Sequence, residues 1–372
     1  MAVRFRVLII EDDRTMIKSL KLTLEDRLID VKVSSTGFRK AKEKVATERP
    51  DAVVMDVFED QTKTTTKADA TWDYIWDVHF CPVVVHSARE EPAFLRGKRH
   101  PFAHYEPKSQ DSQERVAEKL KTYRSHIDGL RAFGDEVAKK AAESLRHVSE
   151  LVWKEPASES EKRDMLLRVT RRRVAASFDL PPTDGHRTRA WEQYIYPPLD
   201  PDILTGDVLR EAAGQANDPC AFRVVLSPSC DLVISQGALE NVLVARCVDA
   251  KRWLKKLSLD AATSEAKLRD KLPREVTRDQ HEGVKILPSL PGHIPLMAVD
   301  LKELELIPRN QIEPLGGGAA SQYVRVASVD SPFREQVAWA YVQVAGRPGM
   351  PVTDAVDFTE RIIQTVKGSK PS

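Results

Sequence analysis

Residues 6–13 read RVLIIEDD, a run of branched apolar residues that ends in three adjacent acidic side chains. The apolar part is typical of a strand that is buried on both faces of a parallel sheet. Glu11, Asp12 and Asp13 follow at the carboxyl end of that strand, where their mutual repulsion is costly unless a cation lies among them. The stretch therefore predicts a buried strand that delivers carboxylates to a cation site.

The composition is that of an ordinary globular protein of 372 residues, which is long enough for two domains. Its formal net charge of +1 argues against attraction of the whole chain to nucleic acid or membrane. We expect no signal peptide and no membrane span, because no apolar run reaches the required length. The four cysteines form no CxxC pair. These features predict a cytoplasmic protein that binds neither membrane nor nucleic acid.

Strand-like and helix-like segments alternate through the first 125 residues. Helical spacing is found at 14–25, 38–47 and 69–78, between segments with strand character. This alternation predicts an α/β domain with a five-stranded parallel sheet of the flavodoxin-like kind and helices on both faces. The five expected strands are 5–10, 31–35, 51–57, 82–88 and 102–106.

The next part of the chain has the spacing of a long helix. Apolar residues recur at 4-3-4-3 spacing from Val116 to Leu130, and no proline interrupts residues 108–155. Two interpretations stay open: one long helix, which could form a homodimer through residues 110–153, or two helices hinged near residues 133–135.

The expected domains are a receiver-like domain at 1–125, a helical linker with a candidate dimerisation helix at 126–160, and an α+β output domain of unknown function at 161–372. In the last of these, strands and helices are mixed without an internal repeat. The expected strands are 202–209, 220–227, 238–248 and 321–329, and the expected helices are 162–176, an insert at 249–273, 332–345 and 354–367.

Polar residues follow several strands of the first expected sheet. Asp56 ends the third strand, Ser87 ends the fourth, and Lys108 follows the fifth. Ligands of open parallel sheets bind beyond the carboxyl ends of the strands. Carboxylates gathered there are suited to Mg²⁺, and a carboxylate can also attack phosphorus to form an acyl phosphate. A lysine and a hydroxyl would then bind the phosphoryl oxygens.

This arrangement resembles the receiver domain of two-component response regulators. The resemblance rests on IIEDD, on MD 44 residues after Asp12, on HSA 31 residues after Asp56, and on YEPK 21 residues after Ser87. It covers about residues 4–125. It implies that Asp56 is the phosphoacceptor and that Mg²⁺ is held by Glu11, Asp12, Asp56 and the backbone carbonyl of Phe58.

The resemblance also assigns three further residues and a set of partners. Ser87 would bond the phosphoryl group, Lys108 would pair with it, and Tyr105 matches the aromatic switch position of the family. The phosphoryl donor would be a histidine kinase, or a GHKL-type ATPase would be the partner. Another protein partner would bind the C-terminal domain.

The sequence departs from the family pattern at three places, one of which is that proline precedes Lys108, whereas in the family it usually follows the lysine. The stretch after Asp56, VFEDQTKTTT, has neither the proline nor the glycine that the family usually has there. The segment between Ser87 and Lys108 contains internal prolines and has poor amphipathicity, so we expect the fourth helix to be short or lost. An alternative function therefore stays open: a degenerate receiver that serves as a docking scaffold, for example in a defence-type complex.

Two features of the C-terminal half could carry chemistry. Cys230 lies beside Asp231 and would need a histidine to act as a nucleophile, but His186, His281 and His293 are remote in sequence. We therefore favour a packing role for Cys230 and expect no activity based on it; whether the protein is an enzyme stays open.

The run Arg171–Arg173 could contact phosphates. Three arginines on one helical turn are more often a solvated face or partners for acidic neighbours, and we favour that interpretation.

Overall fold

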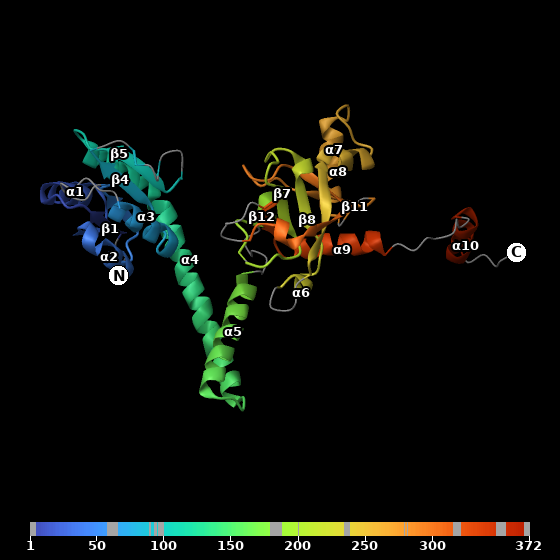
Figure 1. Cartoon of the computed structure of the whole chain (residues 1–372), viewed down its shortest axis with the longest axis horizontal. Coiled ribbons are helices and arrows are strands. Elements are labelled where there is room, and N and C mark those ends of the chain that lie inside the picture. The colour runs from blue at the N-terminus through green and yellow to red at the C-terminus, as the bar shows by residue number, and fades with distance from the viewer. Residues whose placement is uncertain are drawn as a thin grey trace. The chain divides into compact units, whose positions relative to one another are not determined.

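The computed structural model describes residues 5–57, 66–88, 91–92, 95, 100–178, 188–199, 201–233, 239–278, 280, 282–314, 321–346 and 355–367. The chain divides into two compact units, Met1–Pro181 and Pro182–Ser372. Figure 1 labels the helices and several strands of the chain. The domain divisions expected at 125/126 and 160/161 fall inside the first unit and stay predictions.

The first unit is built on a five-stranded sheet in which every pair is parallel. Its strand order is β2-β1-β3-β4-β5, the order of flavodoxin-like domains. The expected fold class of this region is confirmed. The strands are β1 (Phe5–Ile10), β2 (Val31–Thr36), β3 (Ala52–Met55), β4 (Val83–Ser87) and β5 (Ala103–Pro107).

Helices cover both faces of this sheet because alternate strand residues point to opposite sides. Val7 and Ile9 lie in one core with residues of α1 and α4, whereas Leu8 and Ile10 lie in a second core with residues of α2 and α3. Both cores consist mainly of aliphatic side chains, which explains the near-continuous apolar strands. The helices are α1 (Arg14–Arg27), α2 (Ala41–Glu48), α3 (Thr66–Val78) and α4 (Ser112–Lys154), with a 3₁₀ turn at Phe38–Lys40.

Helix α4 is a single helix of 43 residues, so the alternative of a hinge near residues 133–135 is wrong. Its first half packs on the sheet through Val116, Leu120, Tyr123 and Ile127, which are all buried. The 4-3-4-3 spacing of this half therefore reflects packing inside the chain. The expected homodimer through residues 110–153 stays a prediction.

The second half of α4 is covered by a helix that returns along it. Helix α5 (Glu159–Phe178) packs against α4, as Figure 1 shows. Val148 and Val152 of α4 are buried, and Phe133 meets Phe178 with ring centroids 5.9 Å apart. The two helices thus form an antiparallel hairpin within the first unit.

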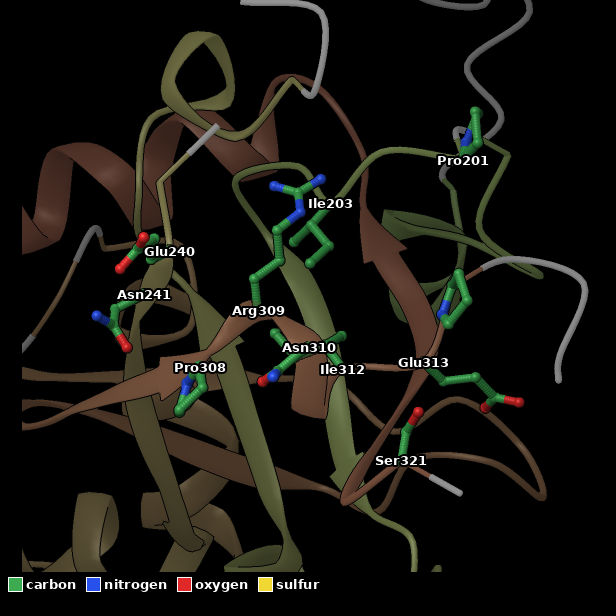
Figure 2. Close-up of a pocket in the computed structure, with 11 residues that line it drawn as sticks. Pro201, Ile203, Glu240, Asn241, Pro308, Arg309, Asn310, Ile312, Glu313 and Ser321 are labelled. Atoms are coloured by element: carbon green, nitrogen blue, oxygen red, sulfur yellow. The ribbon is translucent and has the colours of Figure 1, made fainter. Parts of the chain in front are cut away.

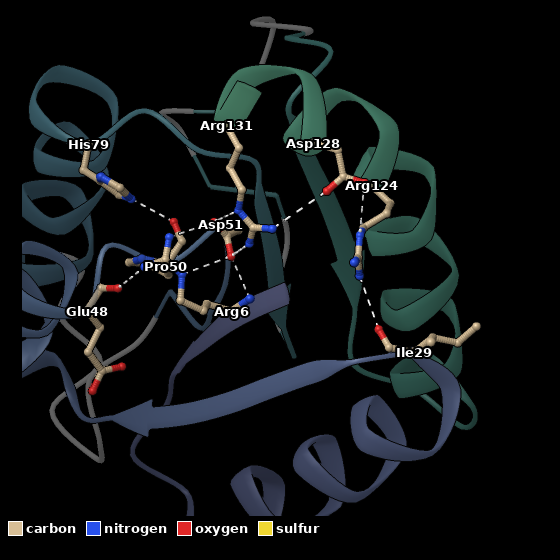
Figure 3. A network of polar contacts seen from close by, with 9 residues as sticks. All are labelled: Arg6, Ile29, Glu48, Pro50, Asp51, His79, Arg124, Asp128 and Arg131. Carbon is tan, nitrogen blue, oxygen red and sulfur yellow. Dashed lines mark hydrogen bonds and ion pairs between the residues drawn. The ribbon is translucent and has the colours of Figure 1, made fainter. Parts of the chain in front are cut away.

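A buried carboxylate, that of Asp51, fixes α4 to the sheet (Figure 3). It lies at the amino ends of the strands, opposite to the acidic residues that follow β1. Asp51 directly precedes β3, and its carboxylate accepts hydrogen bonds from Arg6 Nη2 at 3.0 Å and Arg131 Nε at 3.1 Å. The backbone N–H of Arg6 donates to the same carboxylate at 2.7 Å. Because Arg131 belongs to α4 and Arg6 to β1, Asp51 joins the helix to the sheet.

The family's fourth helix has no counterpart in the described residues between β4 and β5, which are 88, 91–92, 95 and 100–102. Residues 89–90, 93–94 and 96–99 of this segment lie outside the described residues, so the expectation of a short or lost fourth helix stays a prediction.

The second unit contains a seven-stranded antiparallel sheet in the order β10-β11-β9-β8-β7-β12-β6. The expected second α+β domain is confirmed. Its strands are β6 (Tyr194–Ile195), β7 (Asp207–Glu211), β8 (Phe222–Val225), β9 (Asn241–Asp249), β10 (Val284–Leu287), β11 (Met297–Pro308) and β12 (Tyr323–Val329).

Short helices accompany this sheet. The expected insert at 249–273 is found as two helices, and the two expected C-terminal helices are present. They are α6 (Ser229–Leu232), α7 (Ala250–Lys256), α8 (Glu265–Glu275), α9 (Phe333–Ala345) and α10 (Ala355–Lys367), with 3₁₀ turns at Ala190–Gln193, Pro219–Ala221 and Arg309–Gln311. None of the helices in the described ranges has both the length and the apolar character needed to cross a membrane.

Apolar side chains cover both faces of the second sheet. Val337 and Ala340 of α9 pack on one face, and Leu209 and Val225 lie in a separate cluster on the other. A buried ion pair also ties β7 to β12, with Arg325 Nη2 and Asp207 Oδ2 2.9 Å apart.

We predict that Asp51→Asn destabilises the protein by about 2–3 kcal/mol at pH 7, because it leaves two arginines without their buried counter-charge. Burial alone would raise the pKa of Asp51, but hydrogen bonds from Arg6 and Arg131 outweigh it and the pKa is lowered. This contribution to stability is present above the unfolded pKa and lost as pH falls through the folded one. Urea unfolding at pH 7 and pH 3 measures both effects.

The control is Asp128→Asn, which removes an exposed partner of Arg131 and is expected to cost less than about 0.5 kcal/mol. Equal losses for the two variants would contradict this role of Asp51.

Candidate functional site

The backbone brings the predicted site residues to one edge of the first sheet. Hydrogen bonds continue the strand pairing just past the strand ends: Asp56 N–H donates to the Ile10 carbonyl at 2.9 Å, and Lys108 N–H donates to the Ser87 carbonyl at 2.8 Å. Glu11 directly follows β1. The residues after β1, β3 and β5 therefore lie together with the end of β4, at the carboxyl edge where ligands of parallel sheets bind.

Lys108 lies between two of the carboxylates. Its Nζ is 2.6 Å from Glu11 Oε2 and 2.6 Å from Asp56 Oδ2. The side chains of Lys108, Asp56 and Glu11 are 15%, 11% and 6% exposed, so the three charges interact in a partly desolvated setting. The ammonium group thus neutralises two acids that would otherwise repel each other.

The environment changes the pKa values of two of these groups. Burial raises the pKa of Glu11, the hydrogen bond from Lys108 opposes this, and the charge of Asp56 adds to it, so the pKa is raised overall. Burial alone would lower the pKa of Lys108, but the bonds to Asp56 and Glu11 outweigh it and its pKa is raised. Lys108 is therefore firmly protonated at neutral pH.

The three adjacent acids of the opening stretch have different roles. Glu11 Oε1 accepts from the backbone N–H groups of Asp12 and Asp13, each at 3.1 Å. Asp13 caps α1 by accepting from Thr15 N–H at 2.7 Å. Asp12 is exposed, and its carboxylate lies against Gly37. A Cβ at position 37 would require this carboxylate to move.

Ser87 provides an uncommitted buried donor at the same edge. Its side chain is buried, and its Oγ has no hydrogen-bond partner among the described residues. Buried hydroxyls are normally bonded, so an orphaned one calls for a ligand or water.

His86, next to Ser87, links this edge to α4. Its Nε2 lies 2.8 Å from the Oγ of Ser112, the first residue of that helix. Burial, assisted by the charge of Lys108, lowers the pKa of His86 to about 4, so the ring is neutral at pH 7. The sequence reasoning missed this link, although a histidine within an otherwise apolar strand is a visible signal.

The remaining predicted site residues are Tyr105 and Phe58. Tyr105 lies on β5, half-buried against the core that α2 and α3 cover. Phe58 lies outside the described residues.

The donor chemistry of the site suits Mg²⁺. The ion prefers oxygen ligands and usually takes only one or two carboxylates, with water and phosphate oxygens completing its shell. Glu11 and Asp56 already share one cation, the ammonium of Lys108. No cluster of three or more histidine, cysteine or acidic side chains suited to a metal is found in the part of the chain that the structure describes. The acidic pair thus fits Mg²⁺ in ligand type, and the shell would need water or backbone oxygens.

Cys230 of the second unit has no histidine partner among the described contacts. Cys230 is exposed, and its Sγ lies 3.4 Å from Asp231 Oδ1. Of the three candidate histidines, His293 instead stacks on Tyr196 at 4.1 Å, and His186 and His281 lie outside the described residues.

The second unit also has a pocket of about 730 Å³ that the sequence did not predict (Figure 2). Arg309 lies in it, with its guanidinium donating to the Leu232 carbonyl at 2.5 Å and pairing with Asp202 at 3.4 Å. Because the guanidinium of Arg309 already has these two partners, it is not available to bind an anionic ligand in the pocket. Other lining residues are Pro201, Ile203, Glu240, Asn241, Pro308, Asn310, Ile312, Glu313, Pro314 and Ser321.

Comparison with solved structures gives matches to receiver domains over the N-terminal third of the chain. A two-component transcriptional regulator from Clostridium phytofermentans is 18% identical, with 34% of this chain and 98% of that chain covered and a TM-score of 0.28. The response regulator domain of CheB from Thermotoga maritima is 21% identical, with the same coverage and a TM-score of 0.27. The receiver domain of a diguanylate cyclase from Desulfovibrio desulfuricans is 19% identical, again with 34% and 98% covered and a TM-score of 0.27.

No family model matches the sequence, and a search of curated proteins finds no match. The N-terminal region resembles response-regulator receiver domains, and this resemblance rests on its strand order and on the placement of residues after the strands.

We predict that Lys108→Met destabilises the protein by about 2–3 kcal/mol at pH 8 in the presence of EDTA, because Glu11 and Asp56 lose their shared counter-charge. The pKa of Glu11 should then rise further. As pH falls, a carboxyl group whose pKa is higher in the folded than in the unfolded protein is protonated in the folded protein first. Protonation then favours folding, so the variant should gain stability as pH falls from 8 towards 5. Urea unfolding across this range measures the slope.

Lys42→Met, which changes an exposed lysine of α2, is the control and should show neither effect. A Lys108→Met protein as stable as wild type at pH 8 would contradict the assigned bridge.

Proposed function

We propose that the protein is a response-regulator-like signalling protein whose N-terminal domain accepts a phosphoryl group on Asp56. The observation that carries the proposal is the Lys108 bridge, which holds a cation at the carboxylate of Asp56, at the same edge of the sheet as the orphaned hydroxyl of Ser87. This combination provides an anionic nucleophile and donors for the oxygens of an incoming phosphoryl group.

The proposed reaction is a simple phosphoryl transfer. An oxygen of Asp56 attacks phosphorus, the bond from phosphorus to the donor breaks, and the donor leaves with that electron pair. The new bond forms an acyl phosphate on Asp56. Lys108 then pairs with a phosphoryl oxygen and Ser87 donates its hydroxyl hydrogen to another. A cytoplasmic histidine kinase is the proposed donor, because its phosphohistidine supplies such a group.

Mg²⁺ would neutralise part of the charge that the phosphoryl group brings. Glu11, Asp12 and Asp56 would hold the ion, with the backbone carbonyl of Phe58 as a further ligand. With the ion bound, Glu11 no longer depends on Lys108 alone for a counter-charge, so Lys108 becomes available to the phosphoryl group.

The added charge would be transmitted through residues that contact α4. Movement of Ser87 towards the phosphoryl group also moves His86, which bonds Ser112 at the start of α4. We propose that Tyr105, two positions before the end of β5, follows Ser87 inwards. The output would then reach a protein partner of the second unit.

We predict that incubation of the full chain with acetyl phosphate and Mg²⁺ adds one phosphoryl group to the wild type and none to Asp56→Asn. Intact-mass spectrometry measures the gain. Removal of Mg²⁺ with EDTA should abolish it, and Ser87→Ala should slow it. A gain of the same size in Asp56→Asn would show that another residue is modified and would sink the proposal.

We further predict that Asp12→Asn weakens Mg²⁺ binding by at least about tenfold, the loss that even an outer-shell change can cause at a metal site. Isothermal titration calorimetry of the full chain measures the affinity. The matched control is Asp13→Ser, which removes the neighbouring charge but keeps a capping oxygen for α1. Equal weakening by both variants would mean that the effect is only the loss of local negative charge.

A further inference from the structure

An apolar groove lies beside helix α9 of the second unit. Its volume is about 460 Å³. Leu226 and Leu243, from the end of β8 and from β9, line it together with Ala338, Tyr341 and Val342 of α9. Val342 is 54% exposed, so α9 leaves part of this surface uncovered. The other lining residues are Thr205, Pro228, Ser229, Arg334 and Glu335.

Helix α10 carries an apolar face that its own unit leaves exposed. Phe358, Ile362 and Val366 recur four residues apart, so they lie on one side of the helix. They are 61%, 49% and 80% exposed. A helix of 13 residues is marginal in water without tertiary packing, and a face of this kind indicates burial against a partner.

The groove and the apolar face are close together in the chain. Eight residues, 347–354, separate Gly346 at the end of α9 from Ala355 at the start of α10. Such a connection spans at most roughly 30 Å. Since α9 itself forms one wall of the groove and is only about 20 Å long, α10 can reach the groove of its own chain. A short tether of this kind gives a millimolar effective concentration.

Charge also favours this occupant. The polar face of α10 carries Asp357 and Glu360 against Arg361 and Lys367, so it is neutral overall. The lining of the groove has one basic and one acidic side chain, Arg334 and Glu335. No like-charge repulsion opposes docking, whereas a helix that binds anionic membranes would need an excess of basic residues.

We propose that α10 packs its apolar face into the groove formed by α9 with strands β8 and β9 of the same chain. The contact follows the helix-in-groove mode, in which residues at i, i+4 and i+8 anchor the helix. Docking would cover the exposed apolar side chains of both surfaces. It would also leave the groove closed to a helix from another protein until α10 is released.

Disulfide trapping in the full chain tests this contact. In a background of Cys220→Ser and Cys230→Ser, one thiol is placed in the groove by Val342→Cys or Ala338→Cys, and a second on α10 by Ile362→Cys. Glu360→Cys is the matched control, because residues two apart lie on opposite sides of a helix and have the same tether length. Mild oxidation followed by intact-mass spectrometry and gel filtration measures the product.

We expect an intramolecular disulfide from Ile362→Cys with at least one groove position, formed about tenfold or more faster than from Glu360→Cys, which meets the groove only by tethered diffusion. Equal rates for Ile362→Cys and Glu360→Cys would overturn the proposal. A disulfide-linked dimer as the main product would also overturn it, since α10 would then dock on a second copy. The absence of any disulfide at both groove positions would exclude the contact.

Discussion

The ammonium group of Lys108, placed between the carboxylates of Glu11 and Asp56, is the interaction on which the first unit depends. Two acids in a partly desolvated edge repel each other unless a cation lies between them, and the cation itself is stable there only because both acids surround it. The strand register makes this arrangement possible, since it brings the ends of β1, β3 and β5 to the same level. The site is therefore a property of the sheet as well as of its residues.

Helix α4 connects this site to the rest of the first unit. It begins shortly after Lys108, and its first residue, Ser112, bonds His86 at the site edge. Farther along, Arg131 of the same helix binds Asp51 at the opposite edge of the sheet. One rigid helix thus contacts both ends of the parallel sheet before it continues beside α5. A change in charge at the site would reach α4 through its N-terminus, while Asp51 holds the middle of the helix in place.

Strong local patterns explain why part of this could be predicted from the sequence. Buried parallel strands have near-continuous apolar runs, so their ends are easy to locate, and this position singles out Asp56 and Lys108. Their expected roles rest on the resemblance to receiver domains. The segment LKELEL at 301–306 has the residue types of a helix, yet it lies in β11, where pairing with β9 overrides local propensity. The pairing of Asp51 with Arg131 joins residues 80 apart, and no local pattern records it.

The packing of α5 against α4 is a second feature that the sequence could not predict. The 4-3-4-3 spacing of α4 predicts an apolar seam, but it does not say whether a sheet, a second helix or another chain covers it. In the structure the sheet covers Ile127 and the residues before it, and Val148 is buried in the half that α5 covers. The same holds for a contact at the site: the carboxylate of Asp12 lies against Gly37, which is distant in sequence, and no local pattern predicts this contact.

Fluorine NMR of the full chain with beryllium trifluoride, a phosphoryl analogue, and Mg²⁺ shows whether Asp56, Ser87 and Lys108 form one phosphoryl-binding site. We expect bound fluorine signals in the wild type, their loss in Asp56→Asn, and shifted signals in Ser87→Ala and Lys108→Arg, because both side chains would contact the analogue. The absence of bound signals in folded wild-type protein, or unchanged signals in Asp56→Asn, would contradict such a site.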